Sequence, residues 1–427
     1  MSIASLFKDF RSALSVSNAV DISQKYCSIA TRLNADFWQI ESDERHSLQI
    51  GSYGRHTAID GVSDLDMVFE LPAKELERYK KLNANGPSCM LQDVRDSLKK
   101  RYPATPIKAD GQVVGVFFDR YHIEVLPAFL NDDGDYIYGD TNDGGSWKVT
   151  KPRPEIKAVN DLDKTTKGNL KDVSKMLRAW RNKAGVGMGG LLVDTFAYNF
   201  FSQSGKFHCA TYSTYPELFL ALFTYLGTLP EQDYWIAPGS GQRVRCKSKF
   251  QAKAKKAATR CQEAIDAEGD EAQAKRWRKV FGRHFPKVTV AREAAAPDVR
   301  DDEQFIEDRY PVDIRYDIVL DCETKEANVL RDALQKMLRS KQRVPIGRHL
   351  RFHVVGCDVP GNYSLCWKVR NAGSEAVRRN QLRGEITSDK GKREKTETAS
   401  FPGEHFVEVY AVQDGVVVAR ERIGVPI

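Results

Sequence analysis

The stretch SLQIGSYGRHTAIDGVSDLDMVFEL, residues 47–71, decides the fold. A short strand-like run ends at Gly51 and Ser52, and a second strand opens with Asp64 and Asp66. Polar and apolar residues alternate in the second run, so the two aspartates share one face and the opposite, apolar face belongs in a core. Two carboxylates side by side on a strand can together hold Mg²⁺, which takes few protein carboxylates and keeps positions for water and phosphate.

A phosphate-binding turn and a third acid complete the pattern. Gly51 has no side chain, so its backbone can approach a phosphate closely, and Ser52 adds a hydroxyl donor. In YHIEVLPAF, residues 121–129, Glu124 lies on the polar face of the alternation and can project beside the acidic pair if the two strands are neighbours. Two-metal phosphoryl transfer usually needs such a third carboxylate near the attacking hydroxyl. A solvated strand face is the alternative for each acid alone, but the whole set favours a functional site.

Composition sets the broad class of protein. The 427 residues carry a formal net charge of +7, with 41% hydrophobic and 29% charged residues, as in a soluble globular protein of two to four domains. The charge permits an anionic partner without identifying one. The N-terminus has no apolar segment of the signal-peptide type, and no apolar run approaches the length that spans a bilayer. Eight scattered cysteines are typical of reduced thiols, so a cytoplasmic protein without a membrane partner is expected.

Three regions differ in pattern. Residues 1–158 mix helical and strand patterns, residues 159–300 are mostly helical, and residues 305–427 contain strand-like runs typical of a small β-rich domain. The basic run QRVRCKSKFQAKAKKAATRC, residues 242–261, could bind RNA, DNA or polyphosphate. A basic helix face answered by the acidic run that follows is the favoured alternative.

These motifs resemble a known family. GSYGRHTAIDGVSDLDMVFEL with the later IEVLPAF resembles the signature of DNA-polymerase-β-like nucleotidyltransferases. More narrowly, it resembles the oligoadenylate synthetase and cyclic GMP-AMP synthase group, and within that group the bacterial CD-NTases with a SMODS-type catalytic domain. SKMLRAWRNK is similar to the spine helix of the family and RWRKVFGRHFP to the end of its helical half, so the resemblance covers about residues 40–286. The segments WKVRNAGSEAVRRNQLRGEI and GEHFVEVYAV are similar to the AGS-C domain, a ligand sensor fused to some of these enzymes.

The resemblance implies an α+β, bilobal, polymerase-β-like fold, with a mixed sheet in the N-lobe, a helical second lobe and an appended β-rich domain. It implies a Mg²⁺-dependent nucleotidyltransferase, with two ions and Mn²⁺ as a substitute, that makes a cyclic di- or trinucleotide messenger for antiphage defence. The implied partners are ribonucleoside triphosphates including ATP, a nucleic-acid or protein activator, and a downstream effector that binds the product.

Residue roles are implied in the same way. Asp64, Asp66 and Glu124 would be the catalytic metal ligands, and Gly51 and Ser52 would hold the donor triphosphate. Relatives place a basic residue of the spine helix against that triphosphate. Lys175 and Arg178, one turn apart on one helix face, are the candidates here, against the alternative of ordinary surface charges.

Some readings stay open. Three positions depart from the family pattern: the third acid is Glu124 rather than Asp, His56 stands where Gly is common, and Gly189-Gly190 stand near a phosphate-contacting serine. The rival functions are nucleotidyl transfer to RNA ends, a protein or a small molecule, and an inactive nucleotide- or RNA-sensing protein. In the C-terminal region, a nucleotide pocket is considered against a plain β-sandwich core, with the candidates Trp367, Arg370, Asn371, Arg383, Gly384 and His405.

Overall fold

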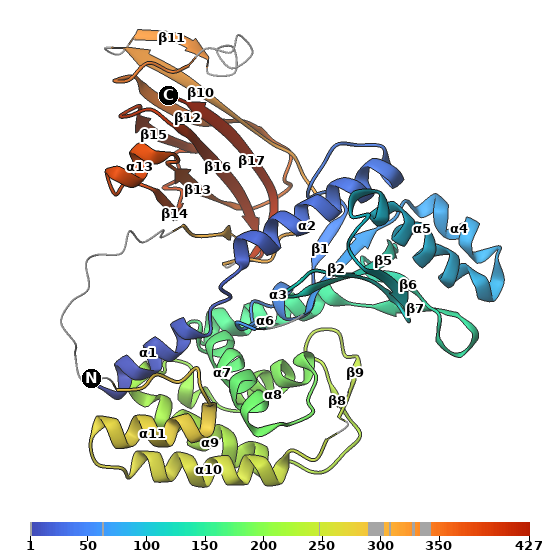
Figure 1. Ribbon diagram of the computed structural model, residues 1–427, viewed down its shortest axis with the longest axis vertical. Coiled ribbons are helices and arrows are strands. Elements are labelled where there is room, and N and C mark those ends of the chain that lie inside the picture. The colour runs from blue at the N-terminus through green and yellow to red at the C-terminus, as the bar shows by residue number, and fades with distance from the viewer. Residues whose placement is uncertain are drawn as a thin grey trace. The chain divides into compact units, whose positions relative to one another are not determined.

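The computed structural model describes residues 2–61, 64–246, 248–288, 303–306, 309–326, 329–333 and 343–427 (Figure 1). The chain forms two compact units, Met1–Asp43 with Ser47–Arg292, and Glu44–His46 with Glu293–Ile427. The predicted boundary at residues 300–305 lies partly outside the described residues, as does Lys247 of the basic run.

A mixed sheet organises the first half of the first unit. Its central order is β1-β2-β5-β4-β3, and β6 and β7 extend it beside β5. The strands are β1 (Ser47–Gln49), β2 (Asp64–Glu70), β3 (Ile107–Asp110), β4 (Val113–Phe117), β5 (His122–Leu130), β6 (Tyr136–Asp140) and β7 (Ser146–Thr150). The β2 and β5 strands are parallel, and β4 runs antiparallel to β5.

Three helices cover one face of this sheet (Figure 1). They are α2 (Ala19–Leu33), α4 (Ala73–Lys80) and α5 (Gly86–Arg101). Their apolar side chains form one buried cluster with the apolar face of β2 and β5, including Met67 and Val125. Burial of this face fixes the register of both strands, so their polar residues must lie on the other face.

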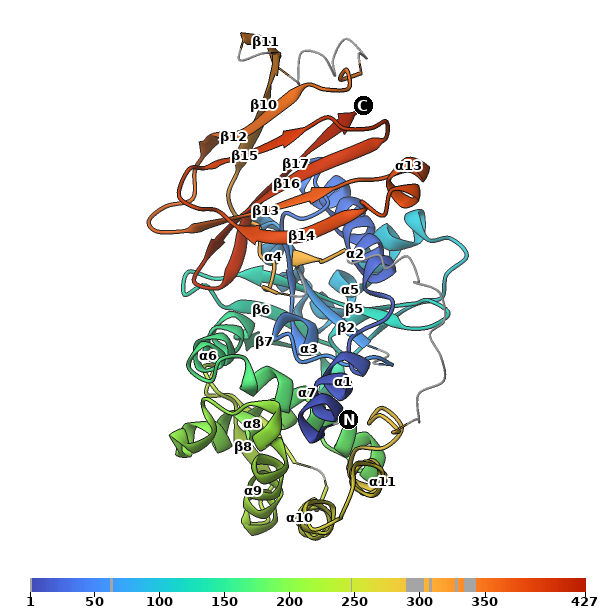
Figure 2. The ribbon, with the colours of Figure 1, turned by 90° about the vertical axis from the view of Figure 1, so that its left-hand side faces the viewer.

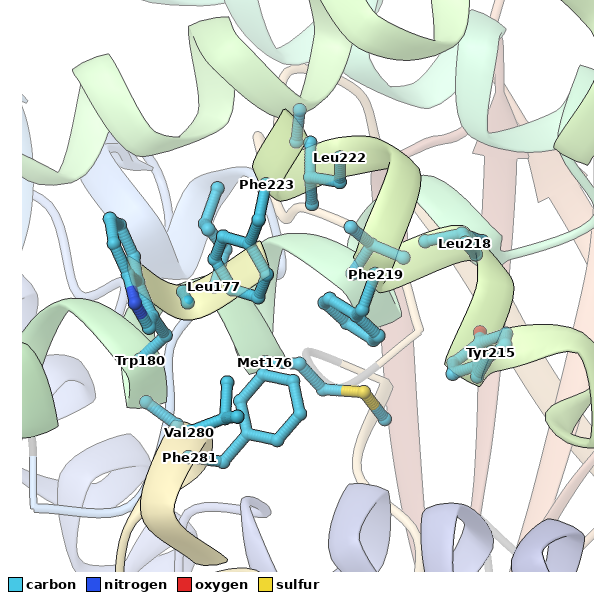
Figure 3. Close-up of a cluster of buried hydrophobic side chains, with 14 of the residues drawn as sticks. Met176, Leu177, Trp180, Tyr215, Leu218, Phe219, Leu222, Phe223, Val280 and Phe281 are labelled. Carbon is cyan, nitrogen blue, oxygen red and sulfur yellow. The ribbon is translucent and has the colours of Figure 1, made fainter. Parts of the chain in front are cut away.

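The second half of the first unit is helical. Its helices are α6 (Pro152–Thr165), α7 (Asn169–Ala184), α8 (Gly190–Gln203), α9 (Tyr215–Thr228), α10 (Gln251–Ile265) and α11 (Asp270–Phe281), with a short hairpin of β8 (Tyr234–Ile236) and β9 (Arg243–Arg245). Figure 3 shows α7, α9 and α11 meeting in an aromatic core. There the Trp180 and Phe223 ring centroids are 5.0 Å apart, and those of Phe219 and Phe281 are 4.8 Å apart.

The N-terminal helix packs with the helical half. The α1 helix (Ile3–Ala13) places Phe7 and Phe10 in the same core as α7, α9 and α11. The predicted division between residues 158 and 159 falls inside α6. Sequence order therefore differs from packing at both places, and the exact lobe limits stay a prediction.

The second unit contains two four-stranded antiparallel sheets, β11-β10-β12-β15 and β14-β13-β16-β17 (Figure 2). Their strands are β10 (Ile318–Glu326), β11 (Val329–Ala333), β12 (His349–Cys357), β13 (Ser364–Arg370), β14 (Arg383–Ser388), β15 (Glu394–Thr398), β16 (Glu404–Gln413) and β17 (Val416–Pro426). The described residues of this unit also include the short helix α13 (Ser374–Arg378). Apolar residues of both sheets, among them Phe352 and Val409, share one core.

No helix among the described residues combines the length and apolarity that a membrane crossing requires.

Candidate active site

The three predicted acids lie on the polar face of the first unit's sheet. In the parallel β2–β5 pairing, Asp66 is the register partner of Glu124, and Asp64 is the partner of His122. Register partners project from the same face of a sheet, so all three carboxylates lie on one face of these two neighbouring strands. The Asp64 side chain is 50% exposed and that of Glu124 is 35% exposed, so both can meet a ligand from solvent.

His122 joins the acids although it was not among the predicted residues. Its Nε2 lies 3.2 Å from Asp64 Oδ1 and 3.3 Å from Glu124 Oε1. Its ring stacks on Phe117, with centroids 5.1 Å apart and an interplanar angle of 23°. His122 precedes Glu124 by two residues, so the same alternation that singled out Glu124 could have identified it.

The electrostatic environment of Asp66 is that of a crowded acidic site. Burial, together with the neighbouring charge of Glu124, raises the pKa of Asp66 to about 6, and the charges of Arg55 and His122 only partly oppose this. The fold therefore disfavours the ionised form of Asp66, first through burial and then through the neighbouring carboxylates.

Gly51 lies directly against Asp66. It begins the short helix α3 (Gly51–Gly54) with a φ of +63°, and a Cβ atom at this position would lie 1.9 Å from Asp66 Oδ2. The Ile50 N–H donates to Asp66 O at 2.9 Å, which keeps the turn beside β2. Only glycine satisfies both the left-handed backbone and the close approach. Ser52 follows, half-buried, in the same turn.

Arg178 is placed inside the protein. Its side chain is 2% exposed, and its guanidinium makes a double contact with Asp194, with Nη1–Oδ1 at 2.6 Å and Nη2–Oδ2 at 2.8 Å. The pKa of Asp194 lies below its ordinary value: burial alone would raise it, but Arg178 and Arg55 outweigh burial. Lys175 is half-buried, and its charge helps Lys171 to oppose the effect of burial on the pKa of Asp163.

Arg181, also on α7, interacts electrostatically with Asp64. Burial and the neighbouring Arg178 lower the pKa of Arg181, while the charges of Asp194 and Asp64 act in the opposite direction. Its Nη1 donates to Met188 O at 3.1 Å. Arg181 is one turn after Arg178 on the same helix, so extending the predicted basic face by one turn would have included it.

Arg55 connects the turn at Gly51 and Ser52 to the helices of the first unit. It directly follows α3, its Nε lies 2.8 Å from Asp194 Oδ2, and its Nη1 lies 3.5 Å from Glu155 Oε2. Thr57 Oγ1 donates to Asp194 Oδ2 at 3.0 Å. Asp194 therefore links the segment that follows Gly51 and Ser52 to α7 through one buried carboxylate.

The donor chemistry of the sheet face fits a divalent cation. Among the described residues, no three acidic, histidine or cysteine side chains already converge as a metal-binding group, and Asp64 and Glu124 instead contact His122. Carboxylate oxygens are the ligands that Mg²⁺ prefers, and a cation there would offset the charges of Glu124 and Asp64 that, after burial, help to raise the pKa of Asp66. Asp64, Asp66 and Glu124 are therefore the residues that would hold it.

Family models match two segments of the chain. A model described as the Second Messenger Oligonucleotide or Dinucleotide Synthetase domain, SMODS, matches residues 1–163. A model described as the Adenylyl/Guanylyl and SMODS C-terminal sensor domain matches residues 300–427. No curated protein sequence matches the chain.

Solved structures share the fold. The CdnC of E. coli MS115-1 in complex with HORMA-deltaN has a TM-score of 0.50 and 16% identity, over 64% of this chain and 94% of that one. The same CdnC with ATP has a TM-score of 0.50 and 15% identity, over 66% of this chain and 98% of that one. The CD-NTase CdnG of Bradyrhizobium diazoefficiens in complex with GTP has a TM-score of 0.48 and 11% identity, over 66% of this chain and 96% of that one. The CdnC likenesses confirm the predicted α+β, polymerase-β-like fold class. With both family models matched, the chain belongs to the bacterial CD-NTases, nucleotidyltransferases of the SMODS type, and it carries a C-terminal sensor domain of the AGS type.

Proposed function

We propose that this protein joins ribonucleoside triphosphates, ATP among them, into a cyclic di- or trinucleotide that serves as a messenger in cytoplasmic antiphage defence. The observation that best supports this is the register of Asp66 beside Glu124, with Gly51 packed directly against Asp66. A binding module has no need of three carboxylates at a phosphate turn, whereas phosphoryl transfer does. The CdnC structure that contains ATP supports a nucleoside triphosphate as the substrate of this fold.

Each transfer would form one phosphodiester bond and break one phosphoanhydride bond. The acceptor ribose hydroxyl attacks the α-phosphorus, and pyrophosphate leaves. Mg²⁺ at Asp64, Asp66 and Glu124, or Mn²⁺ as a substitute, would neutralise charge on the phosphates. The turn at Gly51 and Ser52 would receive the triphosphate through backbone N–H groups and a hydroxyl.

Basic and acidic side chains would have separate roles in the transfer. Glu124 would orient the acceptor hydroxyl and favour loss of its proton. Arg181 would balance charge on the leaving pyrophosphate, with Lys175 one turn before Arg178 as a further candidate. Because Arg178 is engaged with buried Asp194, we assign it to positioning of the spine helix rather than to the triphosphate contact first predicted for it. An activator and a product-binding effector remain part of the proposal.

The test is product analysis. The full chain is incubated with the four ribonucleotides and Mg²⁺, and products are identified by mass spectrometry beside an Asp64→Ala/Asp66→Ala double variant. Cyclic oligonucleotides from the wild type alone would support the proposal. Labelled RNA or protein would indicate another nucleotidyltransferase. No product with any metal or added nucleic acid, from a protein that still binds nucleotide, would favour a sensor.

Gly51→Ala is expected to lower the rate of nucleotidyl transfer by about 10²-fold or more, because the new methyl group must displace the Asp66 carboxylate. Initial rates of pyrophosphate release measure this. The control is Gly241→Ala, since Gly241 has a similar φ of +67° but open space around the added Cβ. Gly241→Ala shares the backbone strain and should leave the rate within about twofold. Equal losses in both variants would contradict the steric argument.

Asp66→Asn is expected to stabilise the metal-free protein at pH 7.5 by about 1–3 kcal/mol, because the fold raises the pKa of Asp66 and so disfavours its charge. In the wild type, the raised pKa means that protonated Asp66 stabilises the folded state at low pH. This stabilisation is lost as pH rises from about 4 to about 6, and the free energy of unfolding stays lower above that range. The variant should lack that pH dependence and also lose any thermal stabilisation by Mg²⁺. Calorimetry in EDTA at pH 5.5 and 7.5, and with Mg²⁺, tests both. A variant less stable than wild type in EDTA at pH 7.5 would contradict the charge-crowding account.

A further inference from the structure

A cavity of about 440 Å³ lies within the β-rich second unit. Its floor consists of inward-facing apolar residues of both sheets, Leu350 and Phe352 from β12 and Val369, Val407 and Val425 from three strands of the other sheet. All five are buried members of the core between the sheets. The cavity therefore lies between the two sheets, where their inward-facing side chains do not pack against each other. Its volume falls in the range of small-molecule sites.

An ion pair joins the two sheets beside this cavity. Arg383 of β14 contacts Glu397 of β15 twice, with Nη1–Oε2 at 2.6 Å and Nη2–Oε1 at 3.0 Å, and both residues line the cavity. Glu397 is the register partner of core-facing Leu350, so it projects toward the interior from an edge strand. The pair thus presents both a donor group and an acceptor group over an apolar floor.

The backbone around Arg383 is strained in a way that supports a built site. Arg383 has a φ of +56° and Gly384 a φ of +126°, and the β13–β14 register shifts between Lys368 and Arg370. A Cβ at Gly384 would lie 2.9 Å from Glu303 Cα, so the chain is also held closely from outside. Such bulges re-aim side chains, and non-glycine residues keep a left-handed conformation only where surrounding structure enforces it.

The charges of the lining are already matched. Among the described lining residues, the charged side chains are Arg383 and Glu397, which neutralise each other. His405 Nδ1 accepts from the Ala372 N–H at 3.2 Å, so its Nε2 carries the proton and donates to Phe401 O at 3.0 Å. Both nitrogens of the imidazole are therefore occupied. Among the described residues that line this cavity, none offers an unpaired cation to a phosphate.

What the lining does offer is flat apolar surface and amide groups. The aromatic rings come from Phe352 and Phe401. The ring of Phe406 instead lies on the opposite face of β16, under Arg422. Asn371 donates through Nδ2 to Gln381 O at 2.8 Å, which leaves its Oδ1 as an acceptor, and the Gln381 side chain also lines the cavity. Aromatic surface with amide donors and acceptors suits a planar heterocycle, since the rings stack and the amides bond its polar edge.

We propose that this cavity binds an uncharged aromatic heterocycle of the nucleobase or nucleoside class, and that it discriminates against the phosphorylated forms. Of the residues considered from the sequence, Asn371, Arg383 and His405 line it. Trp367 instead lies in the core with its Nε1 donating to Asp389, and Arg370 pairs with Glu303. The proposal does not depend on nucleotidyl transfer by the first unit.

Calorimetric titration of the full chain tests it, with adenosine, guanosine, cytidine and uridine as probes beside their 5′-monophosphates. Without metal, at least one nucleoside should bind one-to-one, and its monophosphate should bind at least about 10-fold more weakly. Asn371→Ala should weaken the nucleoside about 10-fold by removing the acceptor. Ser400→Trp, at an exposed lining position, should block the cavity, whereas Asp66→Asn should leave this binding unchanged.

The variant Glu397→Gln tests the discrimination against phosphate most directly. It frees the charge of Arg383, so the monophosphate should gain about 10-fold in affinity while the nucleoside changes little. The proposal is overturned if no nucleoside binds at up to about 1 mM. It is equally overturned if binding is unchanged in both Asn371→Ala and Ser400→Trp, or if the monophosphates bind the wild type as tightly as the nucleosides. Thermal melting of each variant checks folding, and Asn371→Ala decides the matter if Ser400→Trp does not fold.

Discussion

Asp64→Asn is expected to lower nucleotidyl transfer by at least about 10³-fold while the protein keeps its fold. The carboxylate is 50% exposed on the polar face of β2, so its neutral isostere disturbs no core packing. What disappears is one charge of the set that would hold Mg²⁺ at the α-phosphate. Pyrophosphate release at saturating nucleotide measures the rate, and the thermal midpoint should move by less than about 3 °C.

Glu70→Gln is the matched control for this prediction. Glu70 belongs to the same strand and, by alternation, to the same face as Asp64 and Asp66, but it pairs in register with Ala128 instead of an acid or histidine. The rate of Glu70→Gln should stay within about twofold of wild type, because Glu70 lies six residues beyond Asp64 along β2. If Asp64→Asn retains a tenth or more of the wild-type rate, Asp64 is not a metal ligand in the reaction.

Local patterning was enough to predict the two central features of the acidic face. Period-two alternation placed Asp64 and Asp66 together on β2, and the same alternation placed Glu124 on the polar side of β5. What alternation could not supply is the register of Asp66 with Glu124, which depends on a parallel pairing between strands 58 residues apart in sequence. Such pairing is set by burial of both apolar faces under α2, α4 and α5, which no single segment encodes.

The spine helix shows where local reasoning ends. Helical spacing correctly puts Lys175 and Arg178 one turn apart on α7. It cannot tell which cation of this helix interacts with Asp64 and which pairs with a buried carboxylate. The partner of Arg178 is Asp194, on the following helix. The apolar sequence around Asp194 is typical of a buried helix, but it does not indicate which cation the aspartate meets. The N-terminal helix is similar: its apolar Phe7 and Phe10 predict burial, but not burial in the core of the later helices.

Asp194→Ala is expected to lower the free energy of unfolding of the first unit by about 3–5 kcal/mol, because it leaves two guanidinium groups buried without their shared carboxylate. Asp194 is 1% exposed and contacts Arg178, Arg55 and Thr57. Urea denaturation followed by tryptophan fluorescence measures the loss, since Trp180 lies in the same helix as Arg178. The control is Asp161→Ala, which breaks an exposed i,i+4 pair with Lys157 and should cost less than about 1 kcal/mol.

The milder Asp194→Asn separates stability from catalysis. The amide keeps the volume of the side chain but lacks the charge that both arginines share, so Arg55 and the phosphate turn that precedes it lose part of their anchor. Because the turn would receive the triphosphate, the KM for nucleotide should rise, by about 10-fold for a 1.4 kcal/mol loss, in a protein that remains folded. Asp161→Asn should leave KM unchanged. A destabilised Asp194→Asn with normal KM would mean that the buried cluster holds the helices together without positioning the phosphate turn.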